Sequence, residues 1–156
     1  MLQFKVEQIA IHPQHPDKAL ELLTAMGAEQ WVKDQVTAAG YVKASPAKNT
    51  ANLAFNYDMA AENGKLEFEV LQYVKGTSWM QGQNRASHLG MHCSADELDE
   101  WRKFFARRGI TVAQEVYTEN HTNSAIAGKR WYNYVIFDTF AILGIDIKFI
   151  VRKDKP

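Results

Sequence analysis

The sequence contains two copies of one short pattern, and this internal repeat limits the possible folds more than any other feature. The first pair of matching segments is 8–12 (QIAIH) and 88–92 (HLGMH), which share the alternation of side chains and the distance to a following helical segment. The second pair is 66–71 (LEFEVL) and 145–150 (IDIKFI). A repeated unit of this size usually buries its open edge or face against its copy. The repeat therefore predicts two related halves packed side by side.

Periodicity and turn signals in the first half predict a strand, a helix and three further strands. Asp17 is expected to cap the helix, which has one apolar stripe and ends at Gly27. The polar stretch around Ser45 and Pro46 is typical of a loop between two strands. The predicted strands are 4–12, 31–36, 50–57 and 65–73, which gives the order βαβββ.

The second half repeats this order after a polar, glycine-containing connection. Ser94 and Glu97 form a capping-box signature, and the helix that follows is expected to bury an apolar stripe that includes Trp101 and Phe105 before it ends at Gly109. The predicted strands are 87–93, 112–118, 131–138 and 145–152.

These elements define an α+β fold class: two tandem βαβββ modules that form a cup-shaped mixed sheet with the helices on its outer face. At 156 residues and 46% hydrophobic, the chain is long enough for one compact core and too short for two independent ones. We therefore predict a single domain over 1–156, with module one at 1–75, a linker at 76–86 and module two at 87–152.

The charge balance argues against a nucleic-acid or membrane partner. Eighteen basic residues balance eighteen acidic ones, so no overall field would draw the protein to a polyanion. The N-terminus lacks the basic start and apolar core of a signal peptide, and the single cysteine cannot form an internal disulfide. We expect a cytoplasmic protein with a small-molecule ligand.

The matching strands carry polar groups on one of their two faces. Because side chains alternate along a strand, Gln8 and His12 share a face in the first copy, as do His88 and His92 in the second. The apolar positions between them are expected to face the helices. The polar face would then line the inside of the cup, where strands that are distant in sequence converge.

The repeat and the cup together resemble the vicinal oxygen chelate superfamily, which includes glyoxalase I, bleomycin-resistance proteins and extradiol dioxygenases. The resemblance covers nearly the whole chain. It implies four metal-ligand positions, on the first and last strands of each module, which here carry Gln8, Glu69, His88 and Lys148. The first three imply a divalent metal, which could be zinc, nickel, manganese or iron.

Lys148 departs from the family pattern. The fourth position is normally a glutamate that binds the metal and, in glyoxalase I-like enzymes, takes part in the proton shuttle. An ammonium has no lone pair for a metal and repels a cation, and it could pair with Glu69 instead. A metal site and a metal-free polar cluster therefore both stay open. Extradiol dioxygenase chemistry is set aside, because its two-histidine, one-carboxylate iron site needs a histidine at position 8 and a carboxylate at position 148.

Roles for individual residues follow from the cup and from the resemblance. Glu67 and Asp146 form a further repeat-related pair, which we interpret as a solvated rim. The candidate catalytic residues, which would move protons, are Glu69, His12 and His92; the candidate substrate-binding residues are His121, Arg130 and Lys148; the candidate metal ligands are Gln8, Glu69 and His88.

Two functions of different classes are compatible with these residues. The first is a divalent-metal-dependent lyase or isomerase that acts on a substrate with adjacent oxygens. The second is a binding protein without metal or catalysis, as the resemblance to bleomycin-resistance proteins implies. The family resemblance also implies a homodimer.

Overall fold

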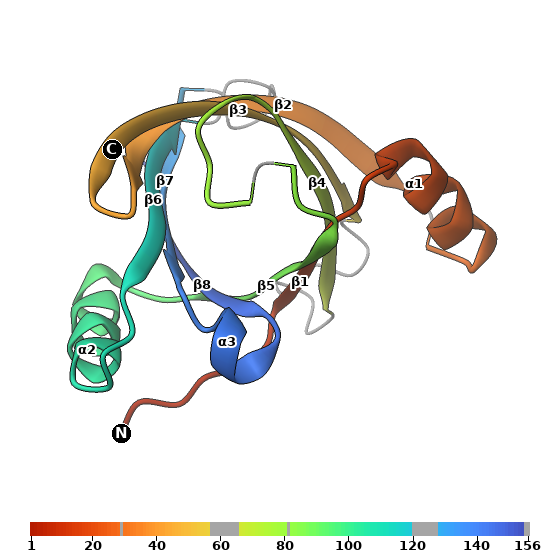
Figure 1. Ribbon diagram of the computed structural model, residues 1–156. Helices are drawn as coiled ribbons and strands as arrows, with labels where there is room; N and C mark the ends of the chain where they lie inside the picture. The colour runs from red at the N-terminus through yellow and green to blue at the C-terminus, as the bar shows by residue number, and fades with distance from the viewer. Residues whose placement is uncertain (29, 57–65, 81, 120–127, 155–156) are drawn as a thin grey trace.

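The structure of this chain is a computed structural model, which describes residues 1–28, 30–56, 66–80, 82–119 and 128–154. In this described part of the chain, eight strands form a closed barrel in the order β1-β4-β3-β2-β6-β7-β8-β5 (Figure 1). Within the described residues, no helix is long and apolar enough to cross a membrane. The predicted α+β class with a curved mixed sheet is confirmed.

Each half of the barrel is one βαβββ module. Module one consists of β1 (Gln8–His12), α1 (Pro16–Ala25), β2 (Trp31–Val42), β3 (Ser45–Asn56) and β4 (Glu67–Gly76). Module two consists of β5 (Arg85–His92), α2 (Ala95–Ala106), β6 (Val112–Glu119), β7 (Arg130–Phe137), the short helix α3 (Phe140–Leu143) and β8 (Asp146–Asp154). The order of elements is the predicted one, with α3 added.

Hydrogen-bond pairing shows how the two modules close the barrel. In each module the first strand pairs in parallel with the last, β1 with β4 and β5 with β8. The modules then join at two antiparallel seams, β1 with β5 and β2 with β6. Both seams lie within one chain. Strands from all parts of the sequence therefore surround one interior.

The β2–β3 hairpin differs from the prediction of a polar loop. Lys43 and Ala44 form the turn with φ of 48° and 64°, so Ser45 and Pro46 already belong to β3. Two successive residues with positive φ are typical of tight two-residue hairpin turns, which usually contain glycine or asparagine. Because neither residue type is present at 43 and 44, residue type did not indicate this turn, and the paired strands are longer than predicted.

Two other boundaries also differ from the prediction. The N-cap of α1 is His15 rather than Asp17, because Pro16 at the first helical position starts the helix earlier. The first strand begins at Gln8 rather than at residue 4. The preceding segment instead crosses to module two, where the Phe4 ring lies 6.4 Å from that of Trp101.

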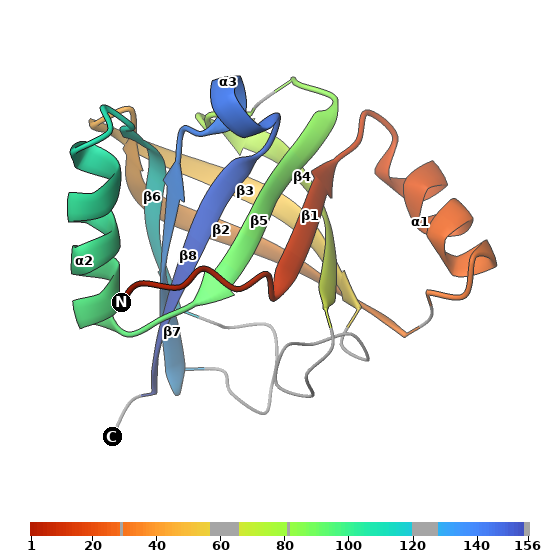
Figure 2. The ribbon, with the colours of Figure 1, turned by 90° about the horizontal axis from the view of Figure 1, so that it is seen from below.

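Helix α2 forms as its capping box predicts. Ser94 Oγ accepts from the Glu97 amide at 3.1 Å, and Glu97 Oε2 accepts from the Ser94 amide at 2.9 Å. The helix buries Leu98, Trp101 and Phe105 against the outer face of module two. Figure 2 shows α1 and α2 outside the barrel on opposite sides.

One end of the barrel is crossed by the segment between β4 and β5 (Figure 1). Asp146 anchors this segment, since its Oδ2 accepts from Trp79 Nε1 at 2.8 Å and from Arg85 at 2.6 Å. Asp146 Oδ1 accepts from the amides of Thr139 and Phe140, both at 3.0 Å. The prediction of a solvated rim is therefore wrong for Asp146, which is buried and serves the structure.

Candidate functional site

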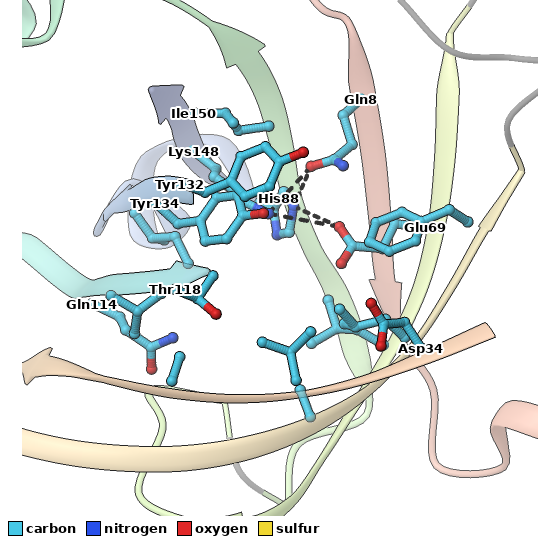
Figure 3. Close-up of a pocket in the computed structure, with 18 of the residues that line it drawn as sticks. Gln8, Asp34, Glu69, His88, Gln114, Thr118, Tyr132, Tyr134, Lys148 and Ile150 are labelled. Carbon is cyan, nitrogen blue, oxygen red and sulfur yellow. Dashed lines mark hydrogen bonds and ion pairs between the residues drawn. The ribbon is translucent and has the colours of Figure 1, made fainter. Parts of the chain in front are cut away.

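The interior of the barrel contains a cavity of about 310 Å³, to which all eight strands contribute side chains. Apolar wall positions include Val36, Leu53, Leu71 and Ile150. Tyrosines from β4 and β7 add aromatic surface, and the first and last strands of each module add a polar cluster (Figure 3). The cavity is the predicted interior of the cup.

The seam between β1 and β5 places Gln8 and His88 at equivalent positions. Ile9 pairs with Leu89, and the flanking pairs join Gln8 to Gly90 and His88 to Ala10. Gln8 and His88 therefore stand on either side of a local twofold axis, and both line the cavity. The register inferred from the repeat is the one that the structure has.

A chain of hydrogen bonds determines how Gln8 and His88 present their atoms. The Gln8 amide nitrogen donates to Glu67 Oε1, so Gln8 Oε1 is turned toward His88 Nε2, 2.9 Å away. Because an amide oxygen only accepts, His88 Nε2 carries the proton. His88 Nδ1 then accepts from Ser87 Oγ at 2.9 Å. Every polar atom of the Gln8–His88 pair has a partner.

Gly90 makes room for this arrangement. A Cβ atom at Gly90 would lie 2.9 Å from Gln8 Oε1 and 3.0 Å from Gln8 Cβ, closer than ordinary contacts. Since Gly90 faces Gln8 across the seam, a side chain there would displace the amide. The equivalent position in module one is Ala10, so the absence of a side chain is particular to module two.

Glu69 and Lys148 complete the polar cluster from the last strand of each module. Lys148 Nζ lies 3.7 Å from Glu69 Oε2, 3.4 Å from Gln8 Oε1 and 4.4 Å from the centroid of the Tyr134 ring. Glu69 Oε2 also lies 3.3 Å from His88 Nε2. Glu69 is 3% exposed and Lys148 7%. Two opposite charges therefore neutralise each other inside the barrel.

The surroundings fix the charge state of the cluster. Burial alone would raise the pKa of the Glu69 carboxyl, but the charge of Lys148 and the neighbouring His88 outweigh burial and hold that pKa below its usual range. Burial lowers the pKa of His88 to about 4, and the Lys148 charge acts in the same direction. At neutral pH, a neutral histidine therefore stands beside an ionised glutamate and lysine.

The donor set does not fit a divalent metal. Gln8, Glu69 and His88 converge as predicted, but Lys148 Nζ stands where the fourth ligand would be and has no lone pair. His88 Nε2 also carries the proton that Gln8 accepts, whereas a metal ligand needs a free lone pair there. Among the described residues, no group of three or more histidine, cysteine or acidic side chains could hold a metal.

The predicted proton-transfer histidines lie in different surroundings from the cluster. His12 does not line the cavity: its Nδ1 donates to the Gln83 carbonyl at 2.6 Å, and its Nε2 accepts from the Tyr73 amide at 3.1 Å. Both ring nitrogens thus serve the backbone, and His12 is not included in the candidate site. His92 lines the cavity but is partly exposed, with Nδ1 3.0 Å from Glu7.

Two of the three predicted substrate-binding residues, Lys148 and Arg130, line the cavity. Lys148 belongs to the cluster, and Arg130 lines the cavity while its Nε donates to Asp154 at 2.7 Å. His121 lies outside the described residues. Asp34 on β2 also lines the cavity and was not predicted, although the alternation of Asp34, Val36 and Ala38 was a signal that could have identified it.

Comparison with known proteins supports the fold and leaves the activity open. No protein-family model matches the sequence, and no curated protein matches it. Among solved structures, methylmalonyl-CoA epimerase from Mycobacterium tuberculosis is similar, with a TM-score of 0.51 and 10% identity over 97% of this chain and 92% of that chain. A hypothetical protein from Bacillus halodurans has a TM-score of 0.48 and 10% identity over 97% of this chain and 96% of that chain. At this identity, the likeness to the epimerase shows a shared fold alone.

Proposed function

We propose that this chain is a glyoxalase-like small-molecule-binding protein, whose barrel cavity takes a partly apolar ligand without a divalent metal. The observation that carries the proposal is the Lys148 ammonium at the fourth position of the cluster, where it balances Glu69. A cation between the two would be repelled by Lys148 and would have to displace it. Of the two functions predicted from the sequence, the metal-free binding protein agrees better with this geometry.

The cavity has the features of a small-ligand site. Its volume of about 310 Å³ lies at the lower end of the range of roughly 300–1,000 Å³ that is usual for ligand pockets. Apolar and aromatic side chains form its walls, and the few polar groups are fixed by hydrogen bonds to one another. Such a site binds mainly through apolar burial, and its polar groups select the orientation of the ligand.

Binding also agrees better than proton transfer with the charge states of the cluster. A general acid or base is most effective when its pKa lies near the working pH. The pKa of Glu69 is held below its usual range, and that of His88 is lowered to about 4. Glu69 is thus a weak base, and neutral His88 already donates its proton to Gln8.

A fluorescent probe and a pair of adjacent variants test the binding proposal. Ala38 is buried and lines the cavity, whereas Ala39 on the same strand is exposed and points outward. The neutral probe 1-aminoanthracene should bind the wild type and Ala39→Phe equally, because the outer face is not involved. Ala38→Phe should fill the cavity and weaken binding by at least about tenfold.

Equal binding of the probe by Ala38→Phe and Ala39→Phe would show that the ligand site is elsewhere. Failure of the wild type to bind 1-aminoanthracene would contradict the proposal itself. Thermal unfolding of both variants checks that each is folded before binding is compared.

Metal affinity provides the second test. Protein purified without chelator or an affinity metal should contain no stoichiometric metal by elemental analysis. Lys148→Glu removes the repulsion and adds an oxygen ligand, so calorimetric titration should show affinity for zinc, nickel or manganese raised more than about tenfold, or about 1.4 kcal/mol. The control Lys153→Glu makes the same charge change at an exposed position of the same strand and should leave affinity unchanged. Tight binding by the wild type would refute a metal-free site.

The homodimer and the cytoplasmic location remain proposals. Exposed apolar side chains on α1 and at its C-cap are compatible with an association of two copies, since Leu22 is 62% exposed and the C-cap residue Met26 74%. Light scattering at micromolar concentration should give twice the chain mass of 17.8 kDa. A mass equal to that of one chain would exclude the dimer.

A further inference from the structure

Asp34 differs from the other charged side chains of the cavity in its lack of a partner. Lys148 and Glu69 balance each other at 3.7 Å, and Arg130 is bonded to Asp154 at 2.7 Å. Asp34 has no hydrogen bond or ion pair with any described residue, and its Oδ1 is buried. The cavity wall therefore carries one negative charge that the described part of the chain does not compensate.

The strand geometry aims this carboxylate into the cavity. Asp34, Val36 and Ala38 alternate along β2 on the inner face, while Lys33 and Gln35 point outward. In Figure 3 the Asp34 side chain lies along the cavity wall on the side opposite Tyr132 and Tyr134. Asp34 as a whole is only half-buried, so a molecule inside the barrel can reach part of its side chain even though Oδ1 is covered.

The surface around Asp34 is suited to an apolar or aromatic group. Leu53 pairs with Asp34 across the β2–β3 hairpin and also lines the cavity, as does Phe55 two residues further along. On the opposite wall, the rings of Tyr132 and Tyr134 are stacked, with centroids 5.4 Å apart and planes 8° from parallel. A ligand bound between these walls would place a flat apolar body beside the carboxylate.

A buried carboxylate oxygen only accepts hydrogen bonds, and a charged donor is its strongest partner. An anionic ligand group at Asp34 would be repelled, and a neutral donor would leave the charge uncompensated. We infer that the ligand is an organic cation, an inference that rests on the proposed function. Its protonated amine pairs with Asp34, and its apolar or aromatic body lies between the cavity walls.

Three naphthalene probes of similar size separate charge from shape. They are 1-naphthylmethylamine, which is cationic at pH 7, 1-naphthalenemethanol, which is neutral, and the carboxylate 1-naphthaleneacetate, which is anionic. The wild type should bind the amine at least about tenfold more tightly than the alcohol, and the acetate most weakly. Affinities are measured by calorimetric titration at low and moderate salt, because an exposed pair would weaken with salt more than a buried one.

Two matched variants assign the preference to Asp34. Asp34→Asn keeps the shape but removes the charge, so it should bring the affinity for the amine to within about threefold of that for the alcohol. Asp99→Asn makes the same charge change on the exposed face of α2, outside the barrel, and should keep the full preference. Unchanged affinity of Asp34→Asn for the alcohol shows that the cavity is intact.

The relative affinities for the amine and the alcohol decide whether the inference holds. Equal or tighter binding of the alcohol by the wild type overturns the inference, as does a preference for the amine that survives Asp34→Asn. If 1-aminoanthracene binds and the amine does not, the cation inference fails while the binding function stands. If neither binds, both fail.

Discussion

Helices α1 and α2 occupy equivalent places in the two modules, but only α2 has fully buried side chains. Helix α2 buries Leu98, Trp101 and Phe105, whereas α1 has no buried residue. The buried members of the hydrophobic cluster all lie in module two, residues 87–152. Two copies of one βαβββ unit have therefore taken different roles, and module two carries the outer core.

The outer faces of the strands explain this difference. In module two, Ile147, Phe149 and Val151 of β8 project toward α2 and belong to its cluster. In module one, α1 contacts β4, whose outward positions are Phe68, Val70 and Gln72, and only Val70 of these is buried. The outward face of β8 carries three successive apolar side chains and that of β4 only two before Gln72, so α2 has the longer apolar surface to pack against.

The largest expected effect tests this comparison at one residue in each helix. Trp101→Ala removes an aromatic side chain from the packed cluster and should lower the free energy of unfolding by about 3–5 kcal/mol. Leu22→Ala in α1 should change it by no more than about 0.5 kcal/mol, because Leu22 is mainly exposed. Urea unfolding at pH 7 measures both. A cost above about 1 kcal/mol for Leu22→Ala would mean that the α1 stripe is covered in solution, as in a dimer.

The second expected effect concerns the equivalent positions 8 and 88. Module one has Gln8 there, which does not titrate, and module two has His88, which does. The folded pKa of His88 is lowered to about 4, so on acidification the unfolded chain takes up a proton near the usual value of 6.5, before the folded protein does. The contribution of neutral His88 to the free energy of unfolding is fully present above pH 6.5 and is lost as the pH falls toward 4. The loss is about 3 kcal/mol.

His88→Gln gives both modules the same residue and should remove this pH dependence. Urea unfolding of the wild type and the variant at several values between pH 7 and 4.5 should show the wild-type curve falling more steeply. Glu69 also titrates below its usual range, so its contribution is lost only at lower pH. Parallel curves for the two proteins would mean that His88 takes up its proton at the same pH in the folded protein as in the unfolded chain.

The fold could be predicted from the sequence because its signals are local. Alternation set the inner and outer faces, the repeat set the register of Gln8 against His88, and the capping box of Ser94 and Glu97 located the start of α2. The convergence of Glu69 with Lys148 followed from matching the last strands. Each inference needed only the spacing of residues within one element and its copy.

What could not be predicted depends on contacts between distant elements. Asp146 matches Glu67 in the repeat, but only the barrel brings Trp79 and Arg85 to it and makes it structural. His12 matches His92, but its ring nitrogens are taken by backbone groups of β4 and of the segment between β4 and β5. Equivalence of positions in a repeat therefore predicts which face a side chain lies on and does not predict its partners.

The smallest expected effect compares the starts of the two helices. Ser94 forms a reciprocal capping box with Glu97, whereas the His15 side chain makes no capping hydrogen bond and α1 starts with Pro16 instead. Ser94→Ala leaves the amide of Glu97 without its partner and should cost about 1 kcal/mol, while His15→Ala should be neutral within about 0.5 kcal/mol. Chemical denaturation of both variants at one pH measures the difference. Because α2 packs against the hydrophobic cluster and α1 does not, only the loss of the α2 cap is expected to lower the free energy of unfolding of the whole protein. An equal loss from both variants would show that the two helices stabilise the barrel to the same extent.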